Sequence, residues 1–462
     1  MPKLWTYNLH YFDYLWALDY SDALTLMSDW IERCTLNRVP VAWESYPISL
    51  RLMNWCGVFF ARFREELQSD IASSSRLFSS IAQQADWLES HIETHLMGNH
   101  LLENAAALAT VGACFAGPHA ARWFENGLSL LREQLDEQVL PDGGHFERSP
   151  MYHSRLVYLL AMLGNIGDSR IDEIVEGPLA KSRNVQSMLS HPDGQLALLN
   201  DSGLGIYNES AEVTKFLGVS SDNPVGPFAL PDSGYFGACT DDNHYIVCDA
   251  GLLGPDYQPG HSHGDMLSFE LSLGGHRAII DSGTYDYNSG SMRDYCRSTR
   301  AHNTVEVDGQ DQAEFWDVFR VARRGKIRQA EFAPMGDGFA LIASHDGYRI
   351  LDRGPIHRRR FRWWNRGILE VKDTLCGSRR HQFVSRLHLH PECSIEELAA
   401  DRVRLKFAGG TFSVCFHGPG QLSIEDSFYC PTFGCCIANQ AIAFSGEFHR
   451  EIEFGFRVIY AP

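Results

Sequence analysis

Apolar residues recur at helical spacing through the first ~200 residues, a pattern that favours a run of helices. Turn sequences such as Gly117-Pro118 and Pro141-Asp-Gly-Gly144 interrupt the pattern. The segments with helical spacing are 49–67, 78–96, 100–115, 120–139 and 151–163. Successive helical hairpins of this kind predict a bundle, a solenoid or an α/α toroid.

From Tyr235 onward the pattern changes to short apolar runs bounded by Gly, Asp or Pro, which is typical of strands. These runs are 244–249, 267–273, 277–281, 304–307, 339–343, 367–373 and 403–407. Many short strands with few helices predict an antiparallel β-sandwich. The Gly-, Ser-, Asp- and Pro-rich segment 200–237 contains the boundary. We therefore expect a multidomain α+β chain, with a helical domain over residues 1–215 and a β-sandwich domain over 216–462.

Charge and residue composition argue against some classes of binding partner and cellular compartment. The formal net charge of −18, from 40 Lys+Arg against 58 Asp+Glu, argues against broad binding to nucleic acid or to an anionic membrane. The 12 Cys show no repeated pair spacing, which indicates thiols of a reducing compartment. The N-terminus lacks the features of a signal peptide, and no stretch approaches the ~20 apolar residues of a membrane span. The chain as given is expected to be cytoplasmic, or periplasmic if the native N-terminus lies further upstream.

A first polar cluster, Gly98-Asn-His-Leu-Leu-Glu-Asn104, opens a predicted helix. His100, Glu103 and Asn104 share one helical face, and Asn99 lies one turn before Glu103. Amide and imidazole donors at a helix N-terminus suit a carboxylate ligand. The alternative is that Asn99 is an N-cap and that the other residues form a solvated face.

A second cluster occupies the predicted loop 142–153, which carries Glu147, Arg148, Tyr152 and His153. An arginine can bind a carboxylate in a bidentate manner, and a tyrosine with a perturbed pKa can act as an acid or a base. A loop network that only connects two helices would have the same composition.

A third cluster consists of His261, His263, Asp281, Arg300 and His302. Histidines two apart on an extended segment point to opposite sides, so one can face a metal and the other a substrate. His263, Asp281 and His302 are ligands of the type that zinc accepts. Buried, hydrogen-bonded histidines are the alternative interpretation.

In combination these clusters resemble the heparinase II/III-like polysaccharide lyases. The motifs are GNHLLEN at 98–104, DGGHFERSPMYH at 142–153, HSHGDMLSFEL at 261–271, IIDSGTYDY at 279–287 and RSTRAHNTVEVDG at 297–309. The resemblance implies an incomplete α/α toroid followed by an antiparallel β-sandwich. It also implies β-elimination in an acidic, uronic-acid-containing oligo- or polysaccharide (EC 4.2.2.-). The opening segments 4–13 and 43–55 are similar to bacterial surface-polysaccharide enzymes.

The resemblance also implies residue roles. Asn99 or His100 would neutralise the uronate carboxylate, Tyr152 would be general base and acid, and His261 would be the partner base on the opposite face of the sugar. The implied zinc ion is mainly structural, and its ligands would be His263, Asp281 and His302. The implied substrate-binding residues are Glu103, Asn104, Glu147, Arg148, His153 and Arg300.

Two other functions fit parts of the pattern. A metal-dependent hydrolase would use the zinc ion to activate water, and a non-catalytic glycan-binding protein would use the same polar clusters without a base. An acidic glycan is the expected partner in each case, without nucleic acid, and an oligomer is compatible with the sequence.

Overall fold

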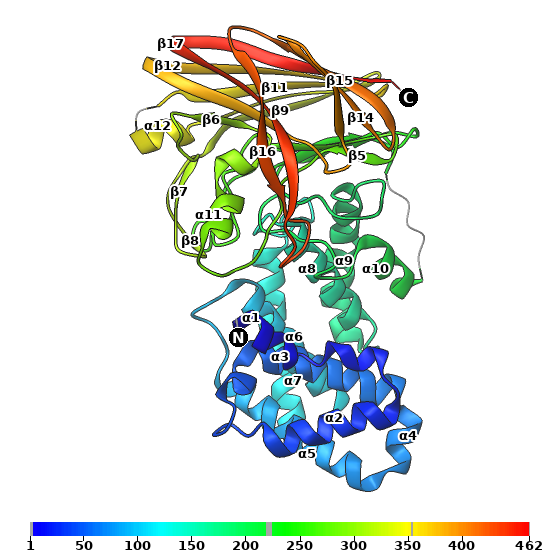
Figure 1. Cartoon of the computed structure of the whole chain (residues 1–462). Coiled ribbons are helices and arrows are strands. Elements are labelled where there is room, and N and C mark those ends of the chain that lie inside the picture. Colours follow the sequence, from blue (N-terminus) through cyan, green and yellow to red (C-terminus); the bar gives the residue numbers. More distant parts are fainter. Residues whose placement is uncertain (1–2, 219–223, 353, 462) are drawn as a thin grey trace. The chain divides into compact units, whose positions relative to one another are not determined.

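The computed structural model describes residues 3–218, 224–352 and 354–461, which form two compact units (Figure 1). The first unit comprises Met1–Gln138 and Leu159–Leu179, and the second comprises Val139–Tyr158 and Ala180–Pro462. The first unit is helical, and the second contains the strands.

The helices begin near the N-terminus and continue to the first strand. They are α1 (Lys3–Leu9), α2 (Tyr20–Arg33), α3 (Ser45–Cys56), α4 (Arg64–Ser69), α5 (Ile71–Ser90), α6 (Gly98–Cys114), α7 (Pro118–Gln138), α8 (Pro150–Gly164), α9 (Ser169–Met188) and α10 (Ser210–Leu217). The change from helix to strand falls between Leu217 and Gly226, whereas the compact units divide the chain elsewhere and place Val139–Tyr158 with the strands.

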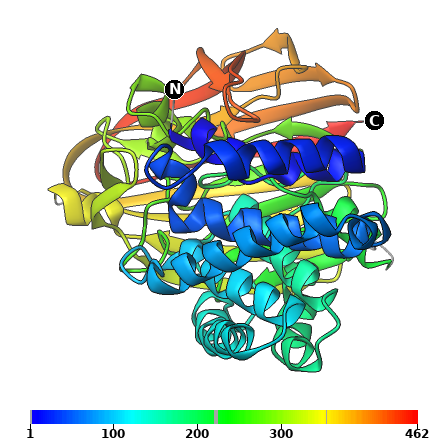
Figure 2. The same ribbon diagram turned by 90° about the horizontal axis from the view of Figure 1, so that it is seen from below.

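The first unit is built from helices packed against one another. Helix α6 packs against α3, α5 and α7, and Figure 2 shows α2, α3 and α5 side by side. The buried face of α6 is made largely of alanine and leucine, which allows close approach of its neighbours. No helix within the described residues is long and apolar enough to cross a membrane.

Arg51 is fully buried within this helical unit. Its guanidinium lies 3.9 Å from the ring centroid of Trp30 and donates to Gln84 Oε1 and to the backbone oxygens of His10 and Ala42. Each nitrogen of this buried guanidinium therefore donates to an oxygen, which offsets the cost of burying the charge.

Two predicted helices have different bounds in the structure. The predicted segment 49–67 is divided because a π-helical turn, Gly57–Arg62, separates α3 from α4. The predicted segment 78–96 is observed as α5, which begins earlier because the Asp70 carboxylate accepts a hydrogen bond from Ser73 N at 3.1 Å and caps the helix.

The strands of the second unit form antiparallel sheets. Within the described residues, a five-stranded sheet has the order β1 (Gly226–Leu230), β2 (Tyr235–Cys239), β3 (Tyr245–Asp249), β4 (Phe269–Leu273) and β5 (His276–Ile279). A ten-stranded sheet has the order β13 (Ser394–Leu398), β14 (Arg402–Phe407), β15 (Gly410–His417), β17 (Ile437–Ala461), β12 (Ile368–His388), β11 (Ile356–Trp364), β10 (Gly338–His345) and β9 (Ile327–Met335), with β16 (Gln421–Tyr429) on β17 and β6 (Val305–Val307) on β12.

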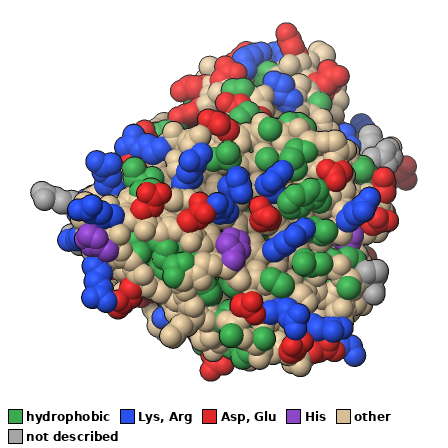
Figure 3. Space-filling model, turned by 90° about the horizontal axis from the view of Figure 1, so that it is seen from above, with side chains coloured by type: hydrophobic (Ala, Val, Ile, Leu, Met, Phe, Trp, Pro, Cys, Tyr) green, Lys and Arg blue, Asp and Glu red, His purple; other side chains and the backbone are tan. Residues whose placement is uncertain are grey.

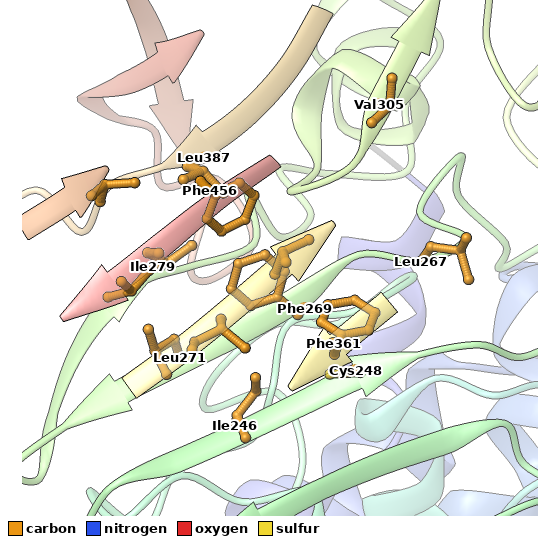
Figure 4. Close-up of a cluster of buried hydrophobic side chains, with 14 of the residues drawn as sticks. Ile246, Cys248, Leu267, Phe269, Leu271, Ile279, Val305, Phe361, Leu387 and Phe456 are labelled. Atoms are coloured by element: carbon orange, nitrogen blue, oxygen red, sulfur yellow. The ribbon is translucent and has the colours of Figure 1, made fainter. Parts of the chain in front are cut away.

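The two sheets enclose one hydrophobic core. Figure 4 shows Ile246 and Phe269 of the five-stranded sheet in one cluster with Phe361, Leu387 and Phe456 of the ten-stranded sheet. Along β11 buried and partly exposed residues alternate, as expected for a strand with one face toward a core. Each large apolar side chain in such a core contributes roughly 1.5–3 kcal/mol to stability. The second unit is therefore a β-sandwich.

The opposite face of the ten-stranded sheet is charged. The view over β12 and β17 in Figure 3 shows Lys and Arg interspersed with Asp and Glu. Arg360 lies 3.5 Å from Glu370 of the neighbouring strand, and Lys372 forms an ion pair with Glu453. Both of these pairs join neighbouring strands across this face.

The remaining elements of the second unit join these sheets. A separate hairpin is formed by β7 (Ala313–Trp316) and β8 (Arg320–Arg324), and two short helices are α11 (Ser291–Arg297) and α12 (Gly347–Asp352).

Candidate active site

A fully buried carboxylate, Asp201, lies at the centre of the polar cluster in the second unit. Its oxygens lie 2.9 Å from Nδ1 of His261 and 2.8 Å from Nε2 of His263. The guanidinium of Arg293 in α11 bonds to both oxygens. Burial alone would raise the pKa of Asp201, but Arg293 and the two imidazoles hold that pKa well below its usual range. Asp201 is therefore an anion that orients two histidines.

The backbone around Asp201 is fixed by the preceding residue. Asn200 has a left-handed backbone (φ 56°), a conformation that asparagine tolerates better than most residues. Its side-chain oxygen accepts from His263 N at 3.1 Å, and its amide donates to Arg148 O at 3.1 Å. The backbone of Asp201 donates to His261 O at 3.0 Å. Side-chain and backbone hydrogen bonds thus hold the Asn200–Asp201 turn against the histidine segment.

His261 has one ring nitrogen committed to Asp201. Because Asp201 is held ionised, Nδ1 of His261 carries the hydrogen, and Nε2 is the nitrogen that can take up a proton. Nε2 lies 3.4 Å from a carboxylate oxygen of the buried Glu147, and 12% of the His261 side chain is exposed. The ring is therefore oriented from one side and flanked by a second carboxylate.

Tyr152, in the first turn of α8, lies against His261. The ring centroids are 4.0 Å apart and the ring planes differ by 35°. The Tyr152 hydroxyl lies 3.3 Å from the hydroxyl of Tyr287. Burial raises the pKa of Tyr152 well above its usual value, and Tyr287, Tyr207 and Asp201 raise it further. The phenol therefore carries its proton at neutral pH.

The proposed opposite-face arrangement of these two groups does not match this geometry. Rings with centroids 4.0 Å apart are in van der Waals contact, so no sugar ring fits between Tyr152 and His261.

The other residues of the 142–153 loop are tied into the fold. Arg148 donates from three nitrogens to the backbone oxygens of Ser233, Phe146 and Asp232, each at 3.1 Å. His153 is buried, its Nδ1 accepts from His145 N at 3.2 Å, and its Nε2 lies 2.8 Å from Ser182 O. These bonds use both His153 nitrogens and most of the Arg148 donors, so the geometry favours structural roles for both over the substrate contacts that the sequence suggests.

Arg300 is exposed, and its guanidinium lies 6.0 Å from the ring centroid of Tyr295. The backbone oxygen of Arg300 faces Nε2 of His388 at 3.1 Å. The side chain is thus at the surface of the second unit, where its predicted contact with a glycan stays a prediction.

Among the three predicted zinc ligands, His302 lies close to both His263 and Asp281. The ring centroids of His263 and His302 are 5.3 Å apart, and His302 Nδ1 lies 2.7 Å from Asp281 Oδ2. Burial opposes the charged form of His302, but the Asp281 carboxylate raises its pKa to about 9.

Two of these predicted ligands have a ring nitrogen that is available to coordinate a metal. Among the described residues, Nδ1 of His263 and Nε2 of His302 are buried without a hydrogen-bond partner. Within the same part of the chain, no group of three or more His, Cys, Asp or Glu is arranged to hold a metal. The donor set therefore fits zinc in its two imidazoles, while Asp281 is engaged by His302, and the zinc ion stays a prediction.

The residues of the first predicted cluster belong to the helical unit. His100 is stacked on Tyr46, with ring centroids 4.2 Å apart, and its Nδ1 lies 3.1 Å from Glu93 Oε1. Asn104 is fully buried, accepts from Glu93 N at 2.9 Å and donates to Ser49 Oγ at 3.0 Å. Asn104 thus connects α6 to α3 and to the segment before α6.

Asn99 and Glu103 differ in exposure. Asn99 is half-buried and Glu103 is buried within α6. The N-cap of α6 is Met97, with φ 56° and no side-chain cap bond, so the alternative interpretation of Asn99 as the N-cap was wrong. Its amide is not used as a cap, and its predicted contact with a uronate carboxylate stays a prediction.

Sequence reasoning missed Asp201, Tyr287 and Arg293. Asp201 lies in a Gly-, Ser- and Asp-rich segment that resembles a linker, and Arg293 lies in a short helix without a motif. The one available signal was Tyr287 at the end of the IIDSGTYDY motif.

Known proteins resemble this chain in sequence. A heparin-sulfate lyase of Bacteroides stercoris is 24% identical over 374 residues, which is 72% of this chain and 52% of that protein. A heparin-sulfate lyase of Pedobacter heparinus is 26% identical over 54% of this chain and 40% of that protein. FtsZ-localized protein C of Caulobacter vibrioides is 25% identical over 76% of this chain and 64% of that protein. The chain thus spans about half the length of the lyases it matches.

Solved structures have the same fold. A heparinase III superposes with a TM-score of 0.77 at 18% identity, covering 99% of this chain and 79% of that chain. The heparan sulfate lyase HepC from Pedobacter heparinus gives a TM-score of 0.72 at 18% identity, covering 98% and 76%. These similarities confirm the predicted fold, a helical toroid followed by an antiparallel β-sandwich.

Family models cover most of the sequence. The model for the heparinase II/III N-terminus matches residues 17–217, and the model for the heparinase II/III-like C-terminal domain matches residues 222–452. The chain therefore belongs to the heparinase II/III-like family.

Proposed function

We propose that this protein is a polysaccharide lyase that cleaves a uronic-acid-containing glycan by β-elimination. The observation that carries the proposal is the contact of the Tyr152 phenol with the His261 imidazole, whose Nδ1 is held by the ionised Asp201. Family membership and the lyases among its relatives support the same activity.

The reaction removes the proton at C5 of the uronate and breaks the bond from C4 to the leaving oxygen. The C5 proton is weakly acidic because the adjacent carboxylate resists further negative charge. Asn99 or His100 would donate to that carboxylate, and a preorganised donor of this kind typically contributes a few kcal/mol. Glu103 would stand beside them on the same helix.

The hydrogen bonds favour different roles for the two rings, with His261 as the base and Tyr152 as the acid. Nε2 of His261 would take the C5 proton, because Nδ1 already carries a hydrogen for Asp201. The protonated phenol of Tyr152 would give its proton to the leaving oxygen as the C4–C5 double bond forms. Glu147, at 3.4 Å from Nε2, would stabilise the imidazolium. A proton passed from His261 to Tyr152 then restores both groups, and acid–base assistance of this kind contributes ~10²–10⁴-fold.

Contact between the two rings supports a syn elimination. A base and an acid on one side of the sugar can serve a proton and a leaving group that lie on the same face. Substrates in which these two groups are anti would need a further acid on the other face.

A zinc ion is a separate part of the proposal. His263 and His302 would hold it through their open nitrogens, and Asp281 would become the third ligand only by leaving its hydrogen bond to Nδ1 of His302. When bound, the ion would fix the segment that carries His261, and no proton transfer needs to pass through it.

A screen of uronate-containing polysaccharides, including heparan sulfate and alginate, tests the proposal. A lyase generates the ultraviolet absorbance of a 4,5-unsaturated uronate without consuming water. New reducing ends without that absorbance would indicate a hydrolase, and binding without new ends would indicate a glycan-binding protein. Either outcome would overturn the lyase proposal.

A further inference from the structure

The β7–β8 hairpin carries two large aromatic side chains at the surface of the second unit. Trp316 is 56% exposed and Phe319 is 43% exposed. Large aromatics usually dominate cores and interfaces, so two of them on one exposed hairpin mark a candidate binding surface.

One face of this hairpin is already used for packing. Phe315 and Val321 pack against the buried Leu253 and Met266. Trp316 is the direct cross-strand partner of Arg320, and both are exposed. The outer face of the hairpin therefore presents an indole and a guanidinium side by side.

The turn of the hairpin is held by two buried arginines of α11. Arg293 donates from Nε and Nη2 to Val318 O at 3.1 and 2.9 Å, and Arg297 donates from Nη1 to Asp317 O at 2.9 Å. The same Arg293 guanidinium binds the carboxylate of Asp201. A single side chain thus links the hairpin turn to the anion that orients His261.

This link places the hairpin beside the candidate catalytic pair. The ring of Phe319 lies 5.6 Å from the ring of His261 and 5.1 Å from the ring of Tyr287, centroid to centroid. A Cβ on Gly260 would approach Cβ and the backbone oxygen of Phe319 to 3.3 Å, so the residue before His261 allows the close approach of the hairpin turn. The aromatic surface of the hairpin is therefore continuous with the active site.

The charge on the hairpin fits an acidic ligand. Arg323 is paired with Glu314 at 2.9 Å. Across the described ranges no carboxylate forms an ion pair with Arg320, whose side chain is exposed. An arginine of this kind is suited to bind a carboxylate or sulfate in a bidentate manner.

We propose that the outer face of the β7–β8 hairpin is a sugar-binding subsite for an acidic glycan. In this subsite Phe319 and Trp316 stack on successive pyranose rings, and Arg320 pairs with a uronate or sulfate group. The subsite rests on the proposed lyase function, since it extends the same active site along the chain of its substrate. The subsite accounts for the exposed Trp316–Arg320 pair. Arg293 links the turn of the hairpin that carries this pair to Asp201, the carboxylate that orients His261.

The chain offers a matched control on another surface. Trp364 on β11 is a half-buried tryptophan whose ring lies 5.3 Å from the guanidinium of Arg362 and 5.8 Å from that of Arg457. It belongs to the charged outer face of the ten-stranded sheet, where Arg360 is paired with Glu370. Trp364→Ala thus removes an aromatic next to arginines without touching the hairpin.

The test uses the polysaccharide that the wild type cleaves in the screen, cut into short and long oligosaccharides of defined size. Trp316→Ala and Arg320→Gln are expected to raise KM for the long fragment by roughly tenfold, with kcat nearly unchanged. The shortest cleavable fragment should be processed as by the wild type. Trp364→Ala should match the wild type on both fragments.

A Trp316→Ala enzyme with wild-type KM on long fragments would overturn the subsite while leaving the lyase function in place. An equal loss on short and long fragments would also overturn it, because the hairpin would then act on the catalytic pair itself. If the wild type cleaves no uronate polysaccharide, the proposed function fails, and the subsite fails with it.

Discussion

The phenol ring of Tyr152 lies against the imidazole ring of His261, with centroids 4.0 Å apart and ring planes 35° apart. Tyr152 comes from helix α8 and His261 from the loop between β3 and β4. A phenol and an imidazole are thus brought together from distant parts of the sequence. The Asp201 carboxylate, which holds Nδ1 of His261 at 2.9 Å, orients one member of the pair.

Tyr152→Phe removes the hydroxyl that would protonate the leaving oxygen. We expect the turnover number to fall by ~10²–10⁴-fold with little change in substrate affinity, because the ring contact with His261 is kept. Initial rates from the ultraviolet absorbance of the product measure the effect. Tyr158→Phe, on the same helix, is the matched control and should retain activity. A Tyr152→Phe enzyme as fast as the wild type would show that another group supplies the proton.

Asp201→Asn keeps the size of the side chain but removes its charge. Arg293 would then be a buried cation without its anion, and breaking a buried pair of this kind costs about 3–5 kcal/mol. We expect a lower midpoint of denaturant unfolding and a loss of activity. The double variant Asp201→Asn/Arg293→Met removes the stranded cation and should recover part of the stability. It should not recover activity, because the anion that orients His261 is still missing.

If the double variant regained full activity, Asp201 would serve only to neutralise Arg293. If the single variant were as stable as the wild type, the buried ion pair would carry little of the stability of this loop. Far-UV circular dichroism at 25 °C should confirm that both variants are folded before rates are compared.

The fold could be predicted to a large extent because its signals are periodic. The helical spacing of the first ~200 residues and the short alternating strands after Tyr235 both follow from burial of one face of each element. The division of the helix predicted over 49–67 could not be predicted, because the π-turn Gly57–Arg62 contains helix-compatible residues. The early start of α5 depends on a single capping contact of Asp70.

The candidate site was predictable only where motifs mark it. Tyr152 and His261 lie in polar motifs, and their neighbourhood is set by long-range packing that no local pattern encodes. Asp201 was missed because its Asn-Asp-Ser-Gly context is that of an ordinary turn. His153 was expected to contact substrate because it lies in the polar motif at 142–153, yet both of its ring nitrogens bond within the fold.

The zinc ion is tested by metal analysis of the purified protein. We expect about one zinc per chain, and its loss in His263→Ala and His302→Ala, whose open nitrogens would be ligands. His388→Gln is the matched control, because both nitrogens of that buried histidine face protein oxygens, Ser427 Oγ at 2.7 Å and Arg300 O at 3.1 Å. Folded wild-type protein without zinc, even after incubation with zinc salts, would contradict the prediction.

His153 makes the stability of the second unit depend on pH. Burial lowers the pKa of His153 from 6.5 to about 4, although the Ser182 carbonyl and Asp142 oppose this shift. The folded state therefore favours the neutral imidazole, whereas the unfolded chain takes up a proton near pH 6.5. The stabilising effect is complete above pH 6.5 and is lost as the pH falls toward 4, by up to about 3 kcal/mol from this residue. His263 and His388, each with a pKa lowered to about 3 mainly by burial, change stability in the same direction.

Urea unfolding at pH 7.0 and pH 4.5 measures this dependence. The wild type should lose stability at the lower pH, and His153→Gln should lose less, because its amide cannot be protonated in the unfolded chain. At pH 7.0 the variant should be less stable than the wild type, since an amide does not reproduce both imidazole contacts, to His145 N and to Ser182 O. Equal slopes of stability against pH in the two proteins would mean that the His153 imidazole is not held neutral in the fold.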